Sequence, residues 1–382
     1  MASAYEVISQ RQDIALMLST AACIGMALGL FPGLIALAVA ARGFDTSWNG
    51  ALAAMPAVAG ILVGPFVPRL IAGSLRLFLL STGLAALGAC LFPYFSEISA
   101  WFLIRFAMGV GMGIQWVVSE AWMNRLAIGP RRGTILSFYV IVLSAAIALG
   151  PYMLSWIGSR GQAPFLTAAL LLILSCLPLV FISSSGEAAH RSSTLSLRAA
   201  FLRKPSTMLT GLADGFIFQT LLVFLPLYFM RLGVAEASAL AYLTLFCLGG
   251  VLLQFVVGYL LDRFTPALVL AACCALLVIG LVLASLVKDA PFLAGPLLVF
   301  TGGCAAAIYT AGLAGINDAF SAAEMPSGTS VFSMLWYIGG VSGPVAAGYA
   351  MDLWDPFGMA AVVAIACASV IAMGMTILLR AR

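Results

Sequence analysis

The stretch Trp101 to Thr134 begins with an apolar run that is long enough to cross a membrane, and two ionisable side chains lie in this run. Arg105 lies near its start, and Glu120 lies near its end, shortly before several basic residues. An ionisable group in hydrocarbon costs on the order of a few kcal/mol or more unless it is paired or solvated, so such groups often mark a substrate or ion route. The structural alternative is that Arg105 reaches to one membrane surface and Glu120 pairs with the basic loop. The sequence leaves both interpretations open.

A further acid, Asp214, lies in a later apolar run with Phe218 and Gln219. At 1.5 Å per helical residue it is about two to three turns from the nearer membrane surface, so it should face protein or water. It could bind a proton or a substrate, or pair with an arginine. We expect Asp214, more than Glu120, to bind a coupling proton, because Asp214 has no arginine near it in sequence and Glu120 lies one turn from the basic loop.

The composition indicates that these groups belong to a membrane protein. Of 382 residues, 63% are hydrophobic and 8% are charged, whereas soluble domains have about 25% charged residues. The net charge of +4 comes from scattered residues, so no nucleic-acid partner is indicated. Eight cysteines without a CxxC pair and one histidine indicate no disulfide framework, metal site or cofactor. Nothing resembles a nucleophile with its base, so we expect no enzymatic activity.

Twelve apolar segments reach the length of about 20 residues that a transmembrane helix needs. The first is too long for a signal peptide, whose apolar core has about 7 to 15 residues. The sequence therefore predicts an all-α, polytopic membrane protein. The predicted spans are residues 14–41, 48–72, 76–95, 99–123, 133–157, 162–183, 207–231, 236–261, 266–287, 291–316, 327–351 and 357–379.

The distribution of Lys and Arg predicts the orientation. With the N-terminus in the cytoplasm, thirteen basic residues fall on the cytoplasmic side and four on the other, and Arg105 lies within a span. Cytoplasmic loops carry such an excess. We therefore expect a multi-pass protein of the bacterial cell (inner) membrane with both termini cytoplasmic.

The chain repeats several landmarks at an offset of about 194 residues. Pro32 corresponds to Pro226, and Gly150-Pro151 corresponds to Gly343-Pro344. The repeat predicts two six-helix bundles that are related by a pseudo-two-fold axis along the membrane normal, with a binding site between them.

The longest polar interruption, residues 184–206, separates the two sets of six spans. It predicts an N-terminal bundle over residues 1–183, a cytoplasmic linker, and a C-terminal bundle over residues 207–382. The linker residues Leu195 to Leu202 form an amphipathic pattern, basic enough to rest on the anionic inner leaflet.

One cytoplasmic loop has a family-specific spacing. Gly258, Asp262 and Arg263 follow a GxxxDR pattern that resembles the loop signature of the major facilitator superfamily (MFS). The first half keeps Gly64 and Arg69 but has proline where the family has aspartate. The resemblance implies a secondary transporter that works by alternating access, with these five residues in its gates. Because the first copy lacks the acid, we expect Asp262 and Arg263 to contribute most.

The resemblance extends along the whole chain. Arg105 and Gly109 match the RxxxG motif of the family's fourth span, and Gly339 to Pro344 resembles its GxxxGP element. The fifth span has alanine at the first glycine of that element, which departs from the pattern of drug and proton antiporters. A glycine that permits close packing and a proline that kinks the helix explain this element without any transport role.

A second, looser resemblance points to one branch of the family. Glu120, Trp122 and Asn124, followed by Arg132 and Gly133, are similar to a stretch found in a bacterial branch that includes YcaD-like proteins. This resemblance indicates the branch and no particular substrate.

The resemblance implies a solute site in the cleft between the bundles, so polar and aromatic residues of the lining spans are candidate contacts for a solute or an ion. The candidates are Arg105, Gln115, Trp116, Glu120, Tyr139, Asp214, Phe218, Gln219, Gln254, Tyr309, Trp336 and Tyr337. Each aromatic residue has an alternative role in packing or at the membrane interface.

The sequence thus predicts a monomeric carrier of a small organic solute across the cytoplasmic membrane. Sparse interior charge and many aromatic residues favour an amphiphilic or heterocyclic, vitamin-like solute, since a phosphate would need several convergent basic residues. Proton-exchanging efflux of drugs or metabolites is one alternative. A membrane sensor or assembly factor on a carrier fold is another, because a fold does not imply a function.

Overall fold

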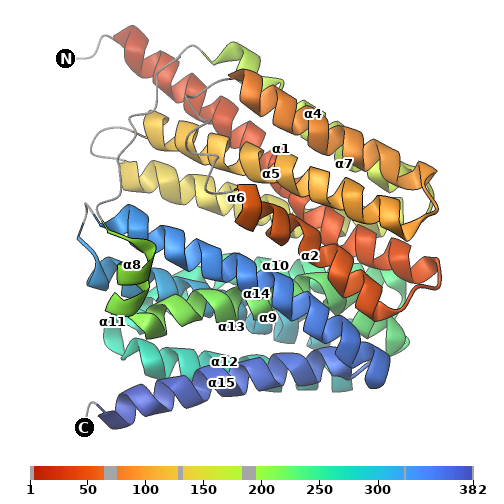
Figure 1. The fold of residues 1–382 in the computed structure, drawn as a ribbon, viewed down its shortest axis with the longest axis vertical. Helices are drawn as coiled ribbons and strands as arrows, with labels where there is room; N and C mark the ends of the chain where they lie inside the picture. The colour runs from red at the N-terminus through yellow and green to blue at the C-terminus, as the bar shows by residue number, and fades with distance from the viewer. Residues whose placement is uncertain (1–3, 64–74, 128–131, 183–194, 322–323, 381–382) are drawn as a thin grey trace. The chain divides into compact units, whose positions relative to one another are not determined.

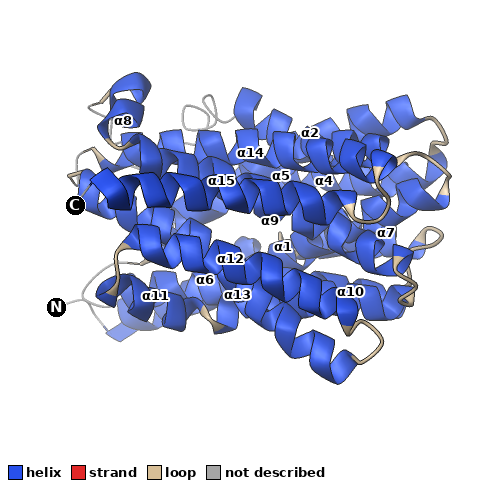
Figure 2. Ribbon diagram, turned by 90° about the horizontal axis from the view of Figure 1, so that it is seen from below, coloured by secondary structure: helices blue, strands red, loops and turns tan. Residues whose placement is uncertain are grey.

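The structure is a computed structural model that describes residues 4–63, 75–127, 132–182, 195–321 and 324–380. These residues form helices and short loops, and no strand occurs among them (Figure 2). Eleven described helices are long and apolar enough to cross a membrane, or twelve if one bent pair counts as a single span. The predicted all-α, polytopic architecture is confirmed.

The first half of the chain contains the helices drawn from red to yellow-green in Figure 1. They are α1 (Ala4–Ala41), α2 (Thr46–Val63), α4 (Leu75–Leu91), α5 (Ile98–Leu126), α6 (Arg132–Ile157) and α7 (Ala163–Leu174), with the 3-10 turns η1 (Phe92–Tyr94) and η2 (Pro178–Phe181).

The second half begins with a short helix and continues with longer ones to the C-terminus (Figure 1). They are α8 (Leu197–Arg203), α9 (Pro205–Arg231), α10 (Glu236–Leu252), α11 (Gln254–Arg263), α12 (Pro266–Leu286), α13 (Pro291–Ala319), α14 (Met325–Leu353) and α15 (Gly358–Arg380).

The eighth predicted span, residues 236–261, is broken, which corrects the prediction of one continuous helix. Helices α10 and α11 meet at Leu253 with a bend of 44°. The adjacent glycines Gly249 and Gly250 immediately precede this break, and paired small residues are a common cause of helix kinks.

The chain forms two compact units. Unit 1 comprises residues 1–34 and 58–190, and unit 2 comprises residues 35–57 and 191–382. Residues 35–57 are therefore grouped with unit 2. They comprise the end of α1, the loop after it and the start of α2, which the sequence predicted to belong to the N-terminal bundle. The division at the 184–206 linker remains a prediction.

The core of unit 1 is assembled from helices far apart in sequence. Met17 of α1, Phe78 of α4, Val118 of α5, Leu143 of α6 and Leu179 of η2 belong to one buried cluster. Helix α4 packs against both α5 and α7. Burying these side chains together is the reason that the isolated helices associate in one arrangement.

Unit 2 is organised around α9, which packs against α10, α13, α14 and α15. Eighteen of its residues are buried, including Phe224 and Phe229. Most of α9 is therefore enclosed by neighbouring helices. Its polar residues Asp214, Thr210 and Thr220 are buried.

Glycines allow α10 and α13 to touch backbone to backbone. A Cβ on Gly302 would collide with the carbonyl oxygen of Phe246, and a Cβ on Gly249 would collide with that of Val299. Small residues at such contacts let membrane helices approach closely. No sideways movement of a flexible side chain could relieve either collision.

Gly302→Ala should lower the stability of the purified protein by roughly 1–3 kcal/mol, because overpacking a tight contact forces backbone shifts. Gly83→Ala is the matched control, since a Cβ there meets nothing within 4 Å. Thermal unfolding in the same detergent compares the two variants. Equal melting temperatures would contradict the close approach of α10 and α13.

The end of the linker is an ordered part of unit 2. The predicted amphipathic segment contains helix α8, whose N-cap Ser196 accepts a hydrogen bond from the Ala199 amide. Ala200 is buried in a cluster with residues of α9, α13 and α14. The Ser327 hydroxyl donates to the Leu195 carbonyl at 3.1 Å. Helix α8 is therefore docked onto the helices that follow it.

An ion pair completes this docking. The Nη1 atom of Arg203 in α8 lies 2.7 Å from Oε1 of Glu324, the residue before α14. The Arg203 guanidinium also lies 5.4 Å from the centre of the Phe320 ring. Hydrogen bonds from Ser321 and from Arg203 lower the pKa of Glu324 from 4.5 to about 2. The carboxylate therefore stays ionised at any physiological pH.

Glu324→Gln should remove a stabilising contact that is fully present above pH 4.5 and is lost as the pH falls toward 2, because the pKa of Glu324 is depressed in the folded protein. The difference in melting temperature between wild type and variant should therefore be constant from pH 5 to 8 and shrink below about pH 4. Thermal unfolding across this range measures it. A difference that grew on acidification would show that the assigned pairing is wrong.

Candidate functional site

Asp214 is the buried acid of unit 2. It lies on α9 with 4% of its surface exposed, and its Oδ2 accepts a 2.8 Å hydrogen bond from the indole Nε1 of Trp336 on α14. No Lys or Arg lies within ion-pair distance of it among the described residues. A carboxyl group in this setting is held in place by a neutral donor, and no described cation fixes its charge.

The two helices that carry this pair are in direct backbone contact. A Cβ on Gly215 would collide with the carbonyl group of Trp336, and a Cβ on Gly339 would collide with that of Leu212. The glycine next to Asp214 therefore sets the distance at which Trp336 reaches it.

Two other aromatic candidates lie on α14, next to Trp336, and on α13. Trp336 and Tyr337 meet edge to face at 5.5 Å between ring centres. Tyr309 on α13 packs against Phe332 in the same way at 5.5 Å and keeps 41% of its surface exposed. Aromatic side chains of this kind commonly line small-molecule sites.

Two other candidates of α9 lie one turn further along. Phe218 stacks on Phe246 of α10 with ring centres 6.2 Å apart. Gln219 lies against α14, because a Cβ on Gly340 would be 3.4 Å from its Cγ. Gln254 lies elsewhere, exposed at the start of α11, where its Nε2 donates to Thr310 at 3.0 Å.

Three candidates of unit 1 are brought together. Glu120 lies beside Trp116 on α5 and near Tyr139 on α6. Tyr139 is 7% exposed, whereas Glu120 is on the surface of the structure. The two acids thus differ in setting: Asp214 is enclosed, and Glu120 is open to its surroundings.

Gln115 is part of a buried hydrogen-bond network. Its Nε2 donates to Thr82 of α4 at 2.9 Å and to the Ser175 hydroxyl after α7 at 3.0 Å. Thr20 of α1 donates to the Ser175 carbonyl at 3.1 Å. This network joins four segments of unit 1, so Gln115 has a structural role that the sequence did not indicate.

Arg105 is 6% exposed and lies 5.7 Å from the centre of the Phe31 ring on α1. No described residue accepts a hydrogen bond from its Nε or Nη1. The structure therefore places this guanidinium inside unit 1, over an aromatic face that favours a cation.

The predicted gate residues of the second half lie at the end of α11. Arg263 stacks on Tyr259 at 4.4 Å, and neither Arg263 nor Asp262 forms an ion pair with a described residue. Gly258 has open space where a Cβ would be. Gly64 and Arg69 lie outside the described residues.

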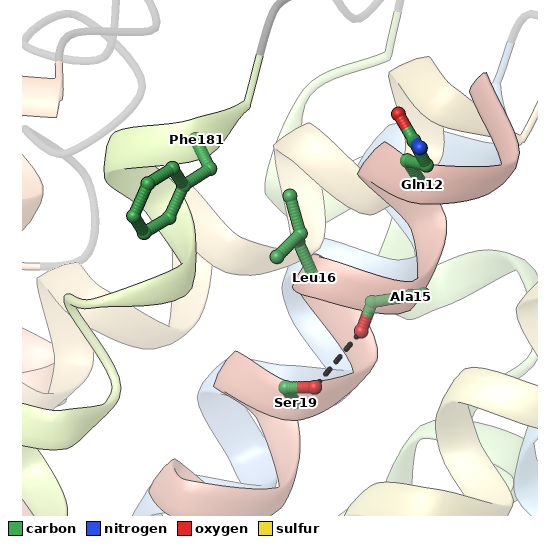
Figure 3. A pocket seen from close by; sticks show the side chains of 5 residues that line it. All are labelled: Gln12, Ala15, Leu16, Ser19 and Phe181. Carbon is green, nitrogen blue, oxygen red and sulfur yellow. Dashed lines mark hydrogen bonds between the residues drawn. The ribbon is translucent and has the colours of Figure 1, made fainter. Parts of the chain in front are cut away.

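A hollow of about 370 Å³ lies on unit 1, away from these candidates. It is lined by Gln12, Ala15, Leu16 and Ser19 of α1 and by Phe181 of η2 (Figure 3). The Ser19 hydroxyl bonds to the Ala15 carbonyl of its own helix at 3.0 Å. The Ser19 hydroxyl is thus already donated within its own helix, and no candidate residue lines the hollow.

The transmembrane helices and the motif positions agree with a known family. A family model described as Major Facilitator Superfamily matches residues 15–302 and again residues 242–382. The chain belongs to the major facilitator superfamily. It is accordingly a multi-pass membrane transporter and not an enzyme.

The relatives and solved structures support this assignment. Uncharacterized MFS-type transporter YfkF of Bacillus subtilis (strain 168) is 23% identical to this chain. The alignment covers 87% of this chain and 86% of YfkF. YcaD of Shigella flexneri serotype 5b (strain 8401) is also 23% identical, over 87% of both. The structure of nucleoside transporter NupG superposes with a TM-score of 0.78 at 12% sequence identity. The match covers 97% of this chain and 98% of the NupG chain. The structure of a bacterial homologue of the human lysosomal transporter Spinster superposes with a TM-score of 0.71 at 12% sequence identity. The match covers 99% of this chain and 96% of the homologue. The expected MFS fold and YcaD-like resemblance are confirmed.

Sequence reasoning missed the hydroxyl partners of Gln115. Thr82 and Ser175 are small polar residues in largely apolar segments, and nothing in their spacing shows that they meet. The available signal is that each of these apolar spans contains uncharged polar residues, and such residues can hydrogen-bond across helices in a membrane protein.

Gln115→Leu should destabilise the protein by roughly 1–3 kcal/mol, because it leaves the buried hydroxyls of Thr82 and Ser175 without their donor. Gln254→Leu is the matched control and should change stability by less than about 0.5 kcal/mol, since Gln254 is exposed. Chemical or thermal unfolding in detergent distinguishes them. A larger loss at Gln254 would contradict the structural role of Gln115.

Proposed function

We propose that this transporter moves a small organic solute, amphiphilic or heterocyclic in character, across the bacterial inner membrane by alternating access, and that protons drive it through Asp214. The protein acts as a monomer with both termini in the cytoplasm, in accordance with the excess of basic residues on that side. Asp262 and Arg263 act in the cytoplasmic gate, the role that the resemblance of their GxxxDR pattern implies.

The observation that carries the proton proposal is the setting of Asp214. It is enclosed in unit 2, accepts a hydrogen bond from Trp336, and has no described cation partner. Ionisable residues inside membrane proteins are rare and commonly serve as proton relays or substrate contacts. An acid held by a neutral donor can gain and lose a proton as water from either side reaches it.

The proposed solute class follows from the side chains near this acid. Tyr309, Trp336 and Tyr337 provide ring faces for stacking, and Asp214 and Gln219 provide hydrogen-bond partners. Flat heterocycles with polar edges match this combination. Of the described transmembrane segments, the interior of unit 1 supplies one buried guanidinium, Arg105, so a phosphate-bearing solute is a poorer match.

Uptake into proteoliposomes tests this proposal directly. Labelled uridine, uracil and nicotinamide represent the heterocyclic class, and the first is chosen because the neighbouring structure NupG is a nucleoside transporter. Accumulation should require an inward proton gradient. Accumulation only under the opposite gradient would indicate proton-exchanging efflux instead, and no movement of any probe would overturn the proposed class.

Asp214→Asn should abolish accumulation driven by a pH gradient while one-for-one exchange of solute across the membrane continues, because the amide keeps a hydrogen-bonding group but cannot carry a proton. Glu120→Gln is the control and should retain most gradient-driven accumulation. Both variants are assayed in proteoliposomes with the solute that the wild type accumulates. Full accumulation by Asp214→Asn would show that this residue carries no proton.

A further inference from the structure

A carboxylate at the end of α14 holds the start of α2. Asp352 Oδ1 accepts from the Thr46 amide at 2.7 Å and also from the Thr46 hydroxyl, and Oδ2 accepts from the Ser47 amide at 3.0 Å. The Thr46 hydroxyl lies 2.8 Å from the Gly348 carbonyl oxygen. All four residues belong to unit 2.

Within the described part of the chain, the Thr46 and Ser47 amides have no other acceptor. The first four N–H groups of an α-helix lack partners within the helix, and a negative charge near them is favourable. Asp45 directly precedes α2 but makes no side-chain hydrogen bond with the described residues. The cap of α2 is thus supplied by Asp352, 306 residues away in sequence.

The contact between these two helix ends is close along two turns. A Cβ on Gly348 would lie 2.5 Å from the Thr46 carbonyl oxygen and 3.0 Å from the Ser47 Cα. A Cβ on Gly50 would collide with the Pro344 carbonyl group. The capped end and the glycine contacts form one continuous contact between α2 and α14. We call this contact, from Asp352 to Pro344 on α14, the seal.

The α2 end of this seal belongs to a compact hairpin, residues 35–57. Asn49 of α2 donates to the Ala36 carbonyl of α1 at 3.0 Å, and both residues are buried. Pro32 precedes the hairpin and Pro56 lies at its other end. Proline removes a helical hydrogen bond and permits bending, so the hairpin can move as one piece.

A second carboxylate three residues further on provides a contrast. Asp355 pairs with Arg231 at the end of α9 at 2.6 Å. It ties α14 to the core helix of unit 2, whereas Asp352 ties α14 to the hairpin. Both carboxylates are exposed, so water can replace the bonds of Asp352 when the seal opens.

We propose that Asp352 is a positioning residue for transport: it latches the start of α2 to the end of α14, and release of this latch opens the transporter at that end. The proposal rests on the alternating-access cycle proposed above. Asp352 contacts no candidate solute residue, and it acts by holding the hairpin closed over Gln219 and its neighbours.

The placement of Gln219 supports this role. The glycine that contacts it, Gly340, lies twelve residues before Asp352 on α14, about 18 Å at 1.5 Å per residue. The same glycine also lies against Ala57 of α2, where a Cβ would be 3.6 Å from the alanine Cβ. The interior end of the seal is therefore beside a candidate solute residue.

Amide hydrogen exchange, resolved to single residues in lipid nanodiscs, tests the latch without any solute. Asp352→Ala should speed exchange of the Thr46 and Ser47 amides about tenfold, because they lose a charged acceptor and have none in their own helix. Asp355→Ala and Asp45→Ala are matched controls that should leave these two amides unchanged. Unchanged exchange in Asp352→Ala, or an equal effect of Asp355→Ala, overturns the proposal.

Labelling from outside intact cells tests whether release opens the transporter. A membrane-impermeant maleimide should react with Q219C at least about threefold faster when Asp352→Ala is added, since loss of the latch shifts the population toward the open state. The same protein without Q219C measures the background from the native cysteines, and Asp355→Ala is again the control.

The two measurements separate failure of the latch from failure of the proposed function. Faster exchange without faster labelling shows that Asp352 only caps α2 and overturns the proposal. Faster exchange and faster labelling support the latch, even if none of the labelled heterocycles is transported, a result that would overturn the proposed solute class alone.

Discussion

Polar groups within a membrane-spanning protein must find their partners inside the protein, on their own helix or on another, because hydrocarbon offers none. This constraint explains the connections that define both units. In unit 1, Gln115 reaches Thr82 and Ser175, which belong to segments far from it in sequence. In unit 2, Trp336 reaches Asp214. Each bond requires its helices to stand at one rotation and depth, and glycines such as Gly215 bring the backbones close enough for the bond to form. Polar pairing and close packing therefore specify the same arrangement.

Much of the fold could be predicted from the sequence, since membrane spans are selected by length and hydrophobicity, which are local properties. The break at Leu253 could not, because Gly249 and Gly250 are also compatible with a straight helix that packs closely. The family assignment followed from short motifs such as Gly258 to Arg263, which are equally local. No comparable signal shows which face of an apolar helix meets which neighbour, because residues on every side of it are apolar.

The candidate site shows the same limit. The sequence identified Asp214 and Trp336 separately, since an acid and an indole stand out among apolar residues, but their hydrogen bond depends on the packing of α9 against α14. It treated Gln115 and Gln254 alike, and the structure gives the first a buried network and the second an exposed contact. A polar residue type indicates that some partner exists. Only tertiary packing decides whether that partner is part of the protein.

The docking of α8 has a consequence for the synthesis of the protein. Its partners Glu324 and Ser327 lie 121 and 132 residues beyond the residues that they contact. At about 5–20 residues per second, the ribosome needs roughly 6 to 26 s to produce them after α8 has emerged. During that interval the nascent chain carries a short helix whose apolar face has no protein to cover it, next to a bilayer into which four more spans are being inserted. The Arg203–Glu324 pair can form only after α13 has been synthesised, while α14 and α15 are still to follow.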